Sequence, residues 1–92
     1  MATIDINRSH TLSIQEAREA VNAIAAELTR ELNVTSSWDG DTLRFHRSGA
    51  DGTIRISGND VRFQADLSLL LRPLKTTISN QVQQYFDRYF RQ

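Results

Sequence analysis

Cysteine is absent from this chain of 92 residues, and proline occurs once, at Pro73. Without cysteine the chain can form no disulfide, and it has no thiolate to bind zinc or attack a substrate. Its stability must therefore come from packing. No apolar run is long enough to span a bilayer, and the first five residues lack a basic leader followed by an apolar stretch. We therefore expect a cytoplasmic protein without a transmembrane segment.

An excess of either charge is also missing, because 11 basic residues balance 11 acidic ones. This balance argues against the dense phosphate neutralisation of most nucleic-acid binders, so we expect no nucleic-acid partner. The length predicts a single domain over residues 1–92, which buries only roughly 60–65% of the surface of its unfolded chain.

The first third of the chain predicts a strand and then a helix. Apolar and polar residues alternate from Ile4 to about His10, as in a half-buried strand. Ser13 and Glu16 have the spacing of a capping box, and Asn33 is a plausible terminator of the helix that follows. The apolar side of this helix should comprise Ile14, Ala17, Val21, Ile24, Ala25, Leu28 and Leu32.

Four short strands should follow, each joined to the next by a turn. The first ends at Trp38, and Asp39-Gly40 is expected to form a two-residue turn. Residues 48–52 predict a second, looser reversal, and residues 58–60 a third. Such short connections are incompatible with parallel crossovers, so the strands should form an antiparallel meander. Its inward side chains should be Leu43, Phe45, Ile54, Ile56, Val61, Phe63, Ala65 and Leu67.

The last quarter predicts one long helix that begins at about Leu69 and is regular from about Arg72. At about 100° per residue, a core face of roughly 80° would hold Leu71, Leu74, Ile78, Val82, Tyr85 and Tyr89. The predicted order is strand, helix, four strands, helix. We expect an α+β fold in which two helices pack on one face of an antiparallel sheet. Its long C-terminal helix makes it loosely similar to helix-grip proteins.

A central motif carries a family resemblance. It reads Trp38-Asp39-Gly40-Asp41-x-Leu43-x-Phe45-x-Arg47-Ser48-Gly49-x-x-Gly52-x-Ile54. With the strand ending at His10, the Glu16-Ala17-Arg18 helix opening and the leucine-rich stretch from Leu67 to Leu74, the chain resembles the polyhydroxyalkanoic acid system proteins. These are also described as polyhydroxyalkanoate (PHA) granule-region proteins. Ser68 departs from the glycine expected before the last helix.

The resemblance covers nearly the whole chain and has functional implications. It implies a bacterial protein whose gene lies near those for polyester storage granules, with a place at the granule surface for some members. It implies no established reaction and no cofactor.

Phe86 and Phe90 are the first candidates for a binding role. They fall outside the predicted core arc, beside Ser79 and Gln83, and are expected to face solvent or a partner. The partner would be the granule surface, a granule-associated protein or a second copy in a homodimer. The alternative is that the helix end meets the first helix, which would make both rings ordinary core.

Two further sets of residues are candidates for binding small molecules. On the sheet face away from the helices, a basic cluster could hold an anion, or could be a solvated face with interspersed counter-charges; it comprises Arg44, His46, Arg55 and Arg62. Between the sheet and the last helix, a pocket would be lined by Trp38, Phe45, Phe63, Leu74 and Ile78. Trp38 could instead close the end of the core.

No catalytic or metal-binding pattern is recognisable. His10 and His46 are the only imidazoles, and no serine, histidine and aspartate follow a convincing triad order. Asp39 and Asp41 flank a turn glycine and are better explained as turn formers than as metal ligands.

We therefore expect a non-catalytic accessory protein of PHA storage that binds granules or proteins. The alternative is a small hydrophobic-ligand-binding protein of helix-grip type. An enzyme acting on hydroxyacyl thioesters has only the implied genomic setting behind it.

Overall fold

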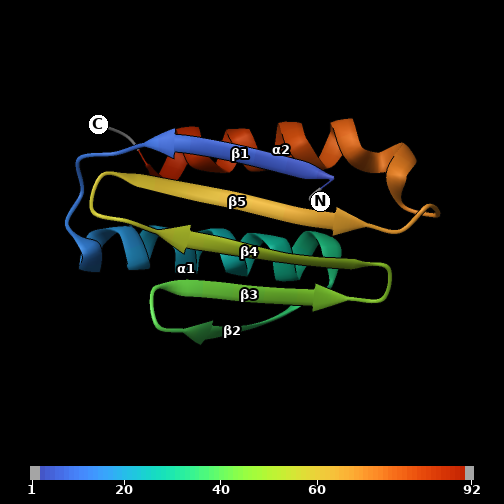
Figure 1. Cartoon of the computed structure of the whole chain (residues 1–92), viewed down its shortest axis with the longest axis horizontal. Coiled ribbons are helices and arrows are strands. Elements are labelled where there is room, and N and C mark those ends of the chain that lie inside the picture. The colour runs from blue at the N-terminus through green and yellow to red at the C-terminus, as the bar shows by residue number, and fades with distance from the viewer. Residues whose placement is uncertain (1–2, 91–92) are drawn as a thin grey trace.

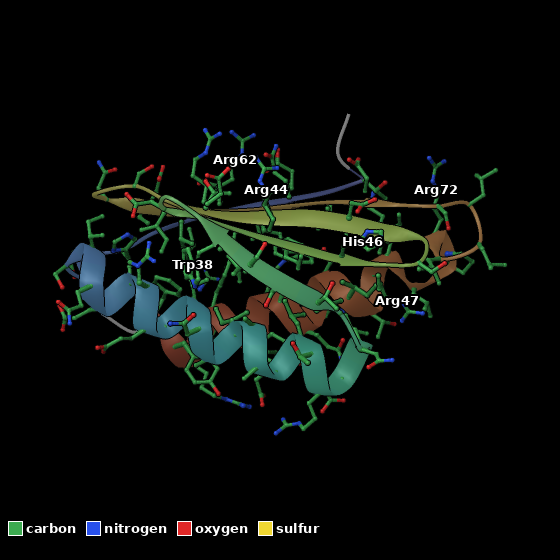
Figure 2. All side chains as sticks on the ribbon, turned by 90° about the horizontal axis from the view of Figure 1, so that it is seen from below. Trp38, Arg44, His46, Arg47, Arg62 and Arg72 are labelled. Atoms are coloured by element: carbon green, nitrogen blue, oxygen red, sulfur yellow. The ribbon has the colours of Figure 1, made fainter. Side chains whose placement is uncertain are left out.

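The computed structural model describes residues 3–90, so the first and last two residues of the predicted domain lie outside it. One five-stranded antiparallel sheet carries two helices on one face (Figures 1 and 2). This confirms the predicted α+β class and the order of the elements. The elements are β1 (Ile4–Ser9), α1 (Ile14–Leu32), β2 (Thr35–Asp39), β3 (Thr42–Arg47), β4 (Ala50–Ile56), β5 (Asp60–Leu67), a 3₁₀ turn η1 (Arg72–Leu74) and α2 (Lys75–Tyr89).

The strands are arranged in the order β1-β5-β4-β3-β2, so β2 to β5 form the predicted antiparallel meander. The first strand joins the far side of the meander, where Ile6 is opposite Phe63. Because β1 and β2 lie at opposite edges, α1 crosses behind the sheet to connect them (Figure 1). This crossing places α1 and α2 side by side on one face and leaves the other face uncovered.

Helix α1 begins and ends where the sequence predicted. The Ser13 hydroxyl accepts from the Glu16 backbone N–H at 3.1 Å, and the Glu16 carboxylate accepts from the Ser13 N–H at 3.0 Å. Asn33 ends the helix in the left-handed region at φ 59°, and its N–H donates to the Thr29 carbonyl. The buried side of the helix is Ala17, Ala20, Val21, Ile24, Ala25 and Leu28.

Two predicted turns differ in detail. Asp39 pairs with Thr42, so the two central turn residues are Gly40 and Asp41, one position later than expected. Gly40 has φ 61°, as the first central position of a type II′ turn requires. The prediction of a looser reversal over residues 48–52 is wrong, because Ala50 already pairs with Arg47. Gly49, at φ 88°, lets two residues close this turn.

The start of the last helix also differs from the prediction. Ser68 ends the β5 pairing, and its carbonyl accepts from the N–H groups of both Leu71 and Arg72 at 3.0 Å. A 3₁₀ turn with Pro73 in its first positions follows, and α2 begins only at Lys75. The last α-helix therefore begins three residues after the predicted regular start at Arg72, and a turn and a 3₁₀ turn occupy residues 69–74.

The core lies between the inner sheet face and the two helices (Figure 2). All of the predicted inward residues of β3, β4 and β5 are buried in it. The largest fully buried side chains are Phe63, Phe86, Ile24, Leu28, Leu43, Ile54, Val21, Val61 and Val82.

Candidate functional site

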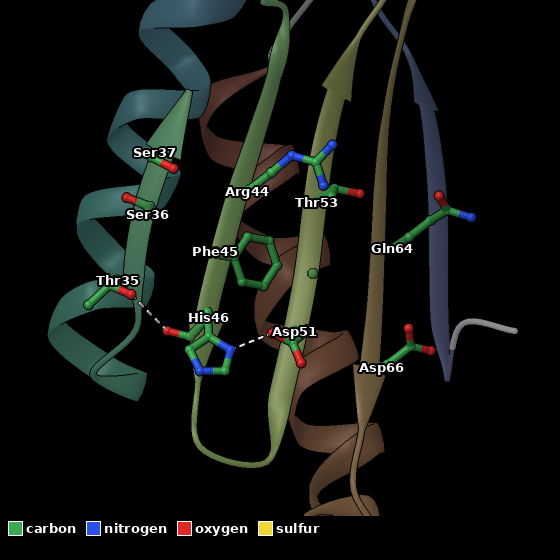
Figure 3. A pocket seen from close by; sticks show the side chains of 11 residues that line it. Thr35, Ser36, Ser37, Arg44, Phe45, His46, Asp51, Thr53, Gln64 and Asp66 are labelled. Carbon is green, nitrogen blue, oxygen red and sulfur yellow. Dashed lines mark hydrogen bonds and ion pairs between the residues drawn. The ribbon is translucent and has the colours of Figure 1, made fainter. Parts of the chain in front are cut away.

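The uncovered sheet face holds the predicted basic cluster. Strands β3, β4 and β5 direct Arg44, His46, Arg55 and Arg62 to this face, at alternate positions from the core residues. The same face has a broad, open hollow of about 680 Å³ (Figure 3). Its lining is mainly hydroxyl, amide and charged groups, from Thr35, Ser36, Ser37, Arg44, Phe45, His46, Asp51, Gly52, Thr53, Gln64 and Asp66.

Carboxylates neutralise most of this cluster. Arg62 donates from Nε and Nη2 to the two carboxylate oxygens of Asp5 at 2.9 and 2.6 Å, and these bonds hold the pKa of Asp5 below its ordinary value. His46 Nδ1 contacts Asp51, and Arg44 lies 3.5 Å from Asp39. These groups are solvent-exposed, so each pair adds little stability.

Arg55 is the one cation of the four without an ion pair among the described residues. It lies directly opposite Arg62 in the pairing of β4 with β5. A second polar hollow, of about 350 Å³, includes both arginines and also Asp60. With one unpaired guanidinium beside a carboxylate, this arrangement agrees better with the solvated, counter-charged alternative.

Four of the five predicted pocket residues do come together. Phe45, Phe63, Leu74 and Ile78 line an apolar cavity of about 40 Å³ between the sheet and the start of α2. An engineered cavity that binds benzene measures about 150 Å³, so this space is too small for an acyl chain. The predicted ligand pocket is therefore not formed in this structure.

Trp38 is elsewhere and has a structural role. Its Nε1 donates to the Asn22 side-chain oxygen at 2.9 Å, and the Arg18 guanidinium lies 4.1 Å from the ring centre. Arg18 also donates to the Gly40 carbonyl at 2.7 Å. The indole thus joins α1 to the β2–β3 hairpin at the margin of the core, and its assignment to the pocket is wrong.

Phe86 and Phe90 are buried, at 0% and 4% exposure, so the expectation that they face solvent or a partner is wrong. Helix α2 packs against α1 on one side and against β1 on the other, which buries a wider arc than a single sheet contact would. On the β1 side, the Arg8 guanidinium lies 5.9 Å from the Phe86 ring centre. On the α1 side, burial and the charges of Glu27 and Glu31 raise the pKa of Tyr85.

His10 belongs to the same buried cluster, which the sequence did not reveal. Its ring centre is 5.6 Å from that of Phe90, Nε2 contacts the Ser57 carbonyl at 3.0 Å, and Nδ1 accepts from the Leu12 N–H at 3.1 Å. The acceptor role of Nδ1 leaves the proton on Nε2, which donates to Ser57. The imidazole therefore has a structural role in holding the β1–α1 loop.

The most exposed apolar group lies in the connection between β5 and α2. Leu69 is 78% exposed, Leu70 is 86% exposed and Leu74 is 46% exposed. We call these three side chains the leucine tip. The sequence prediction placed Leu74 in the core and Leu69 at the start of a helix, so it missed this feature. Pro73 was the available signal, because proline disfavours the helical conformation of the residue before it and is tolerated only in the first turn of a helix.

Basic side chains flank the leucine tip. Arg72 and Lys75 lie within and directly after η1, and neither makes an ion pair in the described part of the chain. Arg47 is also at this end of the molecule, where it donates to the Leu32 carbonyl at 3.1 Å (Figure 2). The tip therefore combines exposed leucines with available positive charge.

Two kinds of site were not found in residues 3–90. No cluster of three or more histidine, aspartate or glutamate side chains is placed to hold a metal ion. Neither helix offers the long uncharged apolar stretch with which a helix crosses a membrane.

These features define a small α+β domain of strand-helix-four-strand-helix order, with a polar open sheet face and an apolar tip at one end. Residues 4–90 match the model of the polyhydroxyalkanoic acid system proteins, and the chain belongs to this family. Among the curated proteins and among the solved structures, no significant match to the chain was found. The family description names a polyhydroxyalkanoic acid system and gives no reaction.

Proposed function

We propose that this protein is a non-catalytic accessory protein of PHA storage that associates with the granule surface through the leucine tip. Membership of the polyhydroxyalkanoic acid system family supports the link to storage. The observation that carries the surface role is the exposure of Leu69 and Leu70. We propose the leucine tip in place of Phe86 and Phe90 as the surface that contacts the granule, because both rings are buried in the core.

The energy of such a contact suits attachment of many copies to one large surface. Covering two leucines contributes about 3–6 kcal/mol, at ~1.5–3 kcal/mol per side chain. Even before association costs, this gain corresponds to a dissociation constant of only roughly 40 µM to 6 mM, so one copy by itself would bind weakly. A granule presents a large apolar area, so weak individual contacts can still concentrate the protein there.

The alternative role as a small hydrophobic-ligand carrier has less support. The enclosed apolar cavity measures about 40 Å³, whereas an acyl chain needs a continuous channel. The surface contact requires no such internal volume, so we favour it.

Localisation in cells tests this proposal. A fluorescently tagged copy should be concentrated on granules in granule-forming cells, and replacement of Leu69→Ser with Leu70→Ser should make the signal diffuse, because the apolar contact is lost. Both residues are exposed, so the variant should keep the thermal stability of the wild type.

Ile14→Ser is the matched control. Ile14 is 38% exposed at the start of α1, at the opposite end of the molecule from the tip (Figure 1). This variant should remain on granules. A diffuse wild-type signal, or a granule signal that the double serine variant leaves unchanged, would refute the proposal.

A further inference from the structure

We infer that the leucine tip docks on a layer of anionic phospholipid. This inference rests on the proposed function and names the chemistry of the surface that the tip contacts. Three observations lead to it: the fixed shape of the tip, the charges beside it and the distribution of charge over the rest of this end of the molecule.

The backbone presents Leu69 and Leu70 in a defined turn. The Ser68 N–H donates to the Gly49 carbonyl at 2.8 Å, which ties the turn to the start of β4. The Ser68 carbonyl then accepts from Leu71 and Arg72, and the Leu74 N–H donates to the Leu71 carbonyl at 2.9 Å. A turn held in this way loses little conformational freedom when its side chains enter an apolar layer.

Leu71 anchors the turn from below. It is half-buried and lines the small cavity, whereas its two predecessors project from the surface. An added Cβ on Gly49 would lie 3.1 Å from Leu71 Cδ1, which shows how closely this leucine packs on the β3–β4 turn. Leu71 therefore holds the turn against the β3–β4 connection, while Leu69 and Leu70 remain exposed.

The charge around the tip is suited to an anionic surface. Residues 67–75 include Arg72 and Lys75 and no acidic residue. Most other arginines of the described chain contact carboxylates; these are Arg8, Arg18, Arg30, Arg44, Arg62 and Arg88. Long basic side chains can lay their apolar stems beside inserted leucines and keep their charged ends at the phosphate level.

The acidic groups at this end favour one orientation. Asp51 and Asp66 are directly opposite each other on the open sheet face, near the ends of β4 and β5 from which the tip projects. His46 contacts Asp51, whereas Asp66 is exposed. An anionic layer would repel these two carboxylates, so the molecule should approach with the leucine tip toward the layer. The surface of an uncharged polymer would not orient the molecule by charge.

Vesicle binding tests the inference. Co-sedimentation is measured with vesicles of phosphatidylcholine alone and with vesicles that also contain phosphatidylglycerol, at low and high salt. The wild type should bind the mixed vesicles more tightly and lose that preference in high salt. The Leu69→Ser with Leu70→Ser variant should bind neither.

Charge variants separate the basic side chains from the leucines. Arg72→Gln with Lys75→Gln should weaken binding to the mixed vesicles about 25-fold, at about fivefold per cation removed. Arg44→Gln with Arg55→Gln changes the net charge equally on the open sheet face, away from the tip, and should weaken binding by less than about threefold. Circular dichroism verifies that all four proteins are folded.

The outcomes distinguish this inference from the proposed function. Equal binding to neutral and anionic vesicles, or no effect of Arg72→Gln with Lys75→Gln, overturns the anionic-lipid assignment. Granule localisation without vesicle binding also overturns it and indicates that the tip contacts polymer or protein, while the proposed function stands. Anionic vesicle binding without granule localisation supports the lipid assignment and refutes the granule role.

Discussion

The ring of Phe45 lies against the backbone of Gly52 on the inner side of the sheet. These residues are directly opposite each other in β3 and β4. A Cβ added at Gly52 would be 2.6 Å from Phe45 Cε2 and 2.7 Å from the Gln64 carbonyl oxygen. Glycine is therefore required here for space, because no side chain fits between the ring and the neighbouring strand.

A substitution at this glycine should be costly. Gly52→Ala should lower the free energy of unfolding by about 1–3 kcal/mol, the usual range for overpacking a tight site. Urea denaturation monitored by circular dichroism measures the loss. Gly58→Ala is the control, because nothing lies within 4 Å of its added Cβ and its φ is not positive. Equal stability of the two variants would contradict the packing explanation.

The residue scale also shows which assignments the sequence could support. The alternation in β3 and β4 placed Phe45 and Ile54 inward correctly, because strand periodicity depends on neighbouring residues only. The contact between Trp38 and Asn22 joins residues from two elements whose relative position no local pattern specifies. The same is true of the buried position of His10.

The start of α1 depends on an interaction between two residues three positions apart. The Ser13 backbone and hydroxyl hydrogen bonds hold the pKa of Glu16 below its ordinary value. The unfolded chain therefore binds this proton more readily than the folded chain does. The stabilisation is present at neutral pH and is lost as the pH falls below about 4.3 and through the lower pKa of the folded state.

The Glu16→Gln variant tests this dependence. At neutral pH the wild type should have the higher thermal midpoint, because only its carboxylate is charged at the positive end of the helix dipole. The difference between the two proteins should shrink as the pH falls from about 5 to about 3. Thermal melts followed by circular dichroism measure it. A constant difference across this range would show that the carboxylate charge does not contribute.

At the scale of elements, the segment between β5 and α2 shows where hydrophobic periodicity fails to predict the start of a helix. Leucines at 67, 69, 70, 71 and 74 can be fitted to several patterns, and the helical pattern was extended too far. The hydrogen bonds at Ser68 and the 3₁₀ turn end that pattern before α2 begins. Local geometry of this kind is decided by contacts with Gly49, which is distant in sequence.

At the scale of the molecule, Phe86 and Phe90 are buried although the sequence predicted exposure, and Leu74 is exposed although the sequence predicted burial. The aromatic end of α2 fills the space between α1 and β1, whereas two leucines of the preceding turn project into solvent. The long axis of the molecule, 37 Å against 25 and 22 Å, separates these groups. One end is therefore core, and the other presents a surface for contact.

Two substitutions compare the buried Phe86 with the exposed Leu70. Phe86→Ala should lower the free energy of unfolding by about 3–5 kcal/mol, because it opens a cavity in a fully buried region. Leu70→Ala should change it by less than about 0.5 kcal/mol, since the side chain is already in water. Urea unfolding of both variants against the wild type makes the measurement. A neutral Phe86→Ala would mean that the ring is not part of the core.

The sequence by itself determined the strands, the two helices, the capping box and the family, because these depend on alternation, helical spacing and motifs read along the chain. Tertiary structure decided which arc of α2 is buried, how small the internal cavity is and which leucines are exposed. The physical reason is that α2 contacts α1 and β1 at the same time, and the angle between those two surfaces follows from the packing of the whole sheet. Which side chains are buried at such a junction depends on how the sheet and both helices pack together. The periodicity of a single segment cannot specify it.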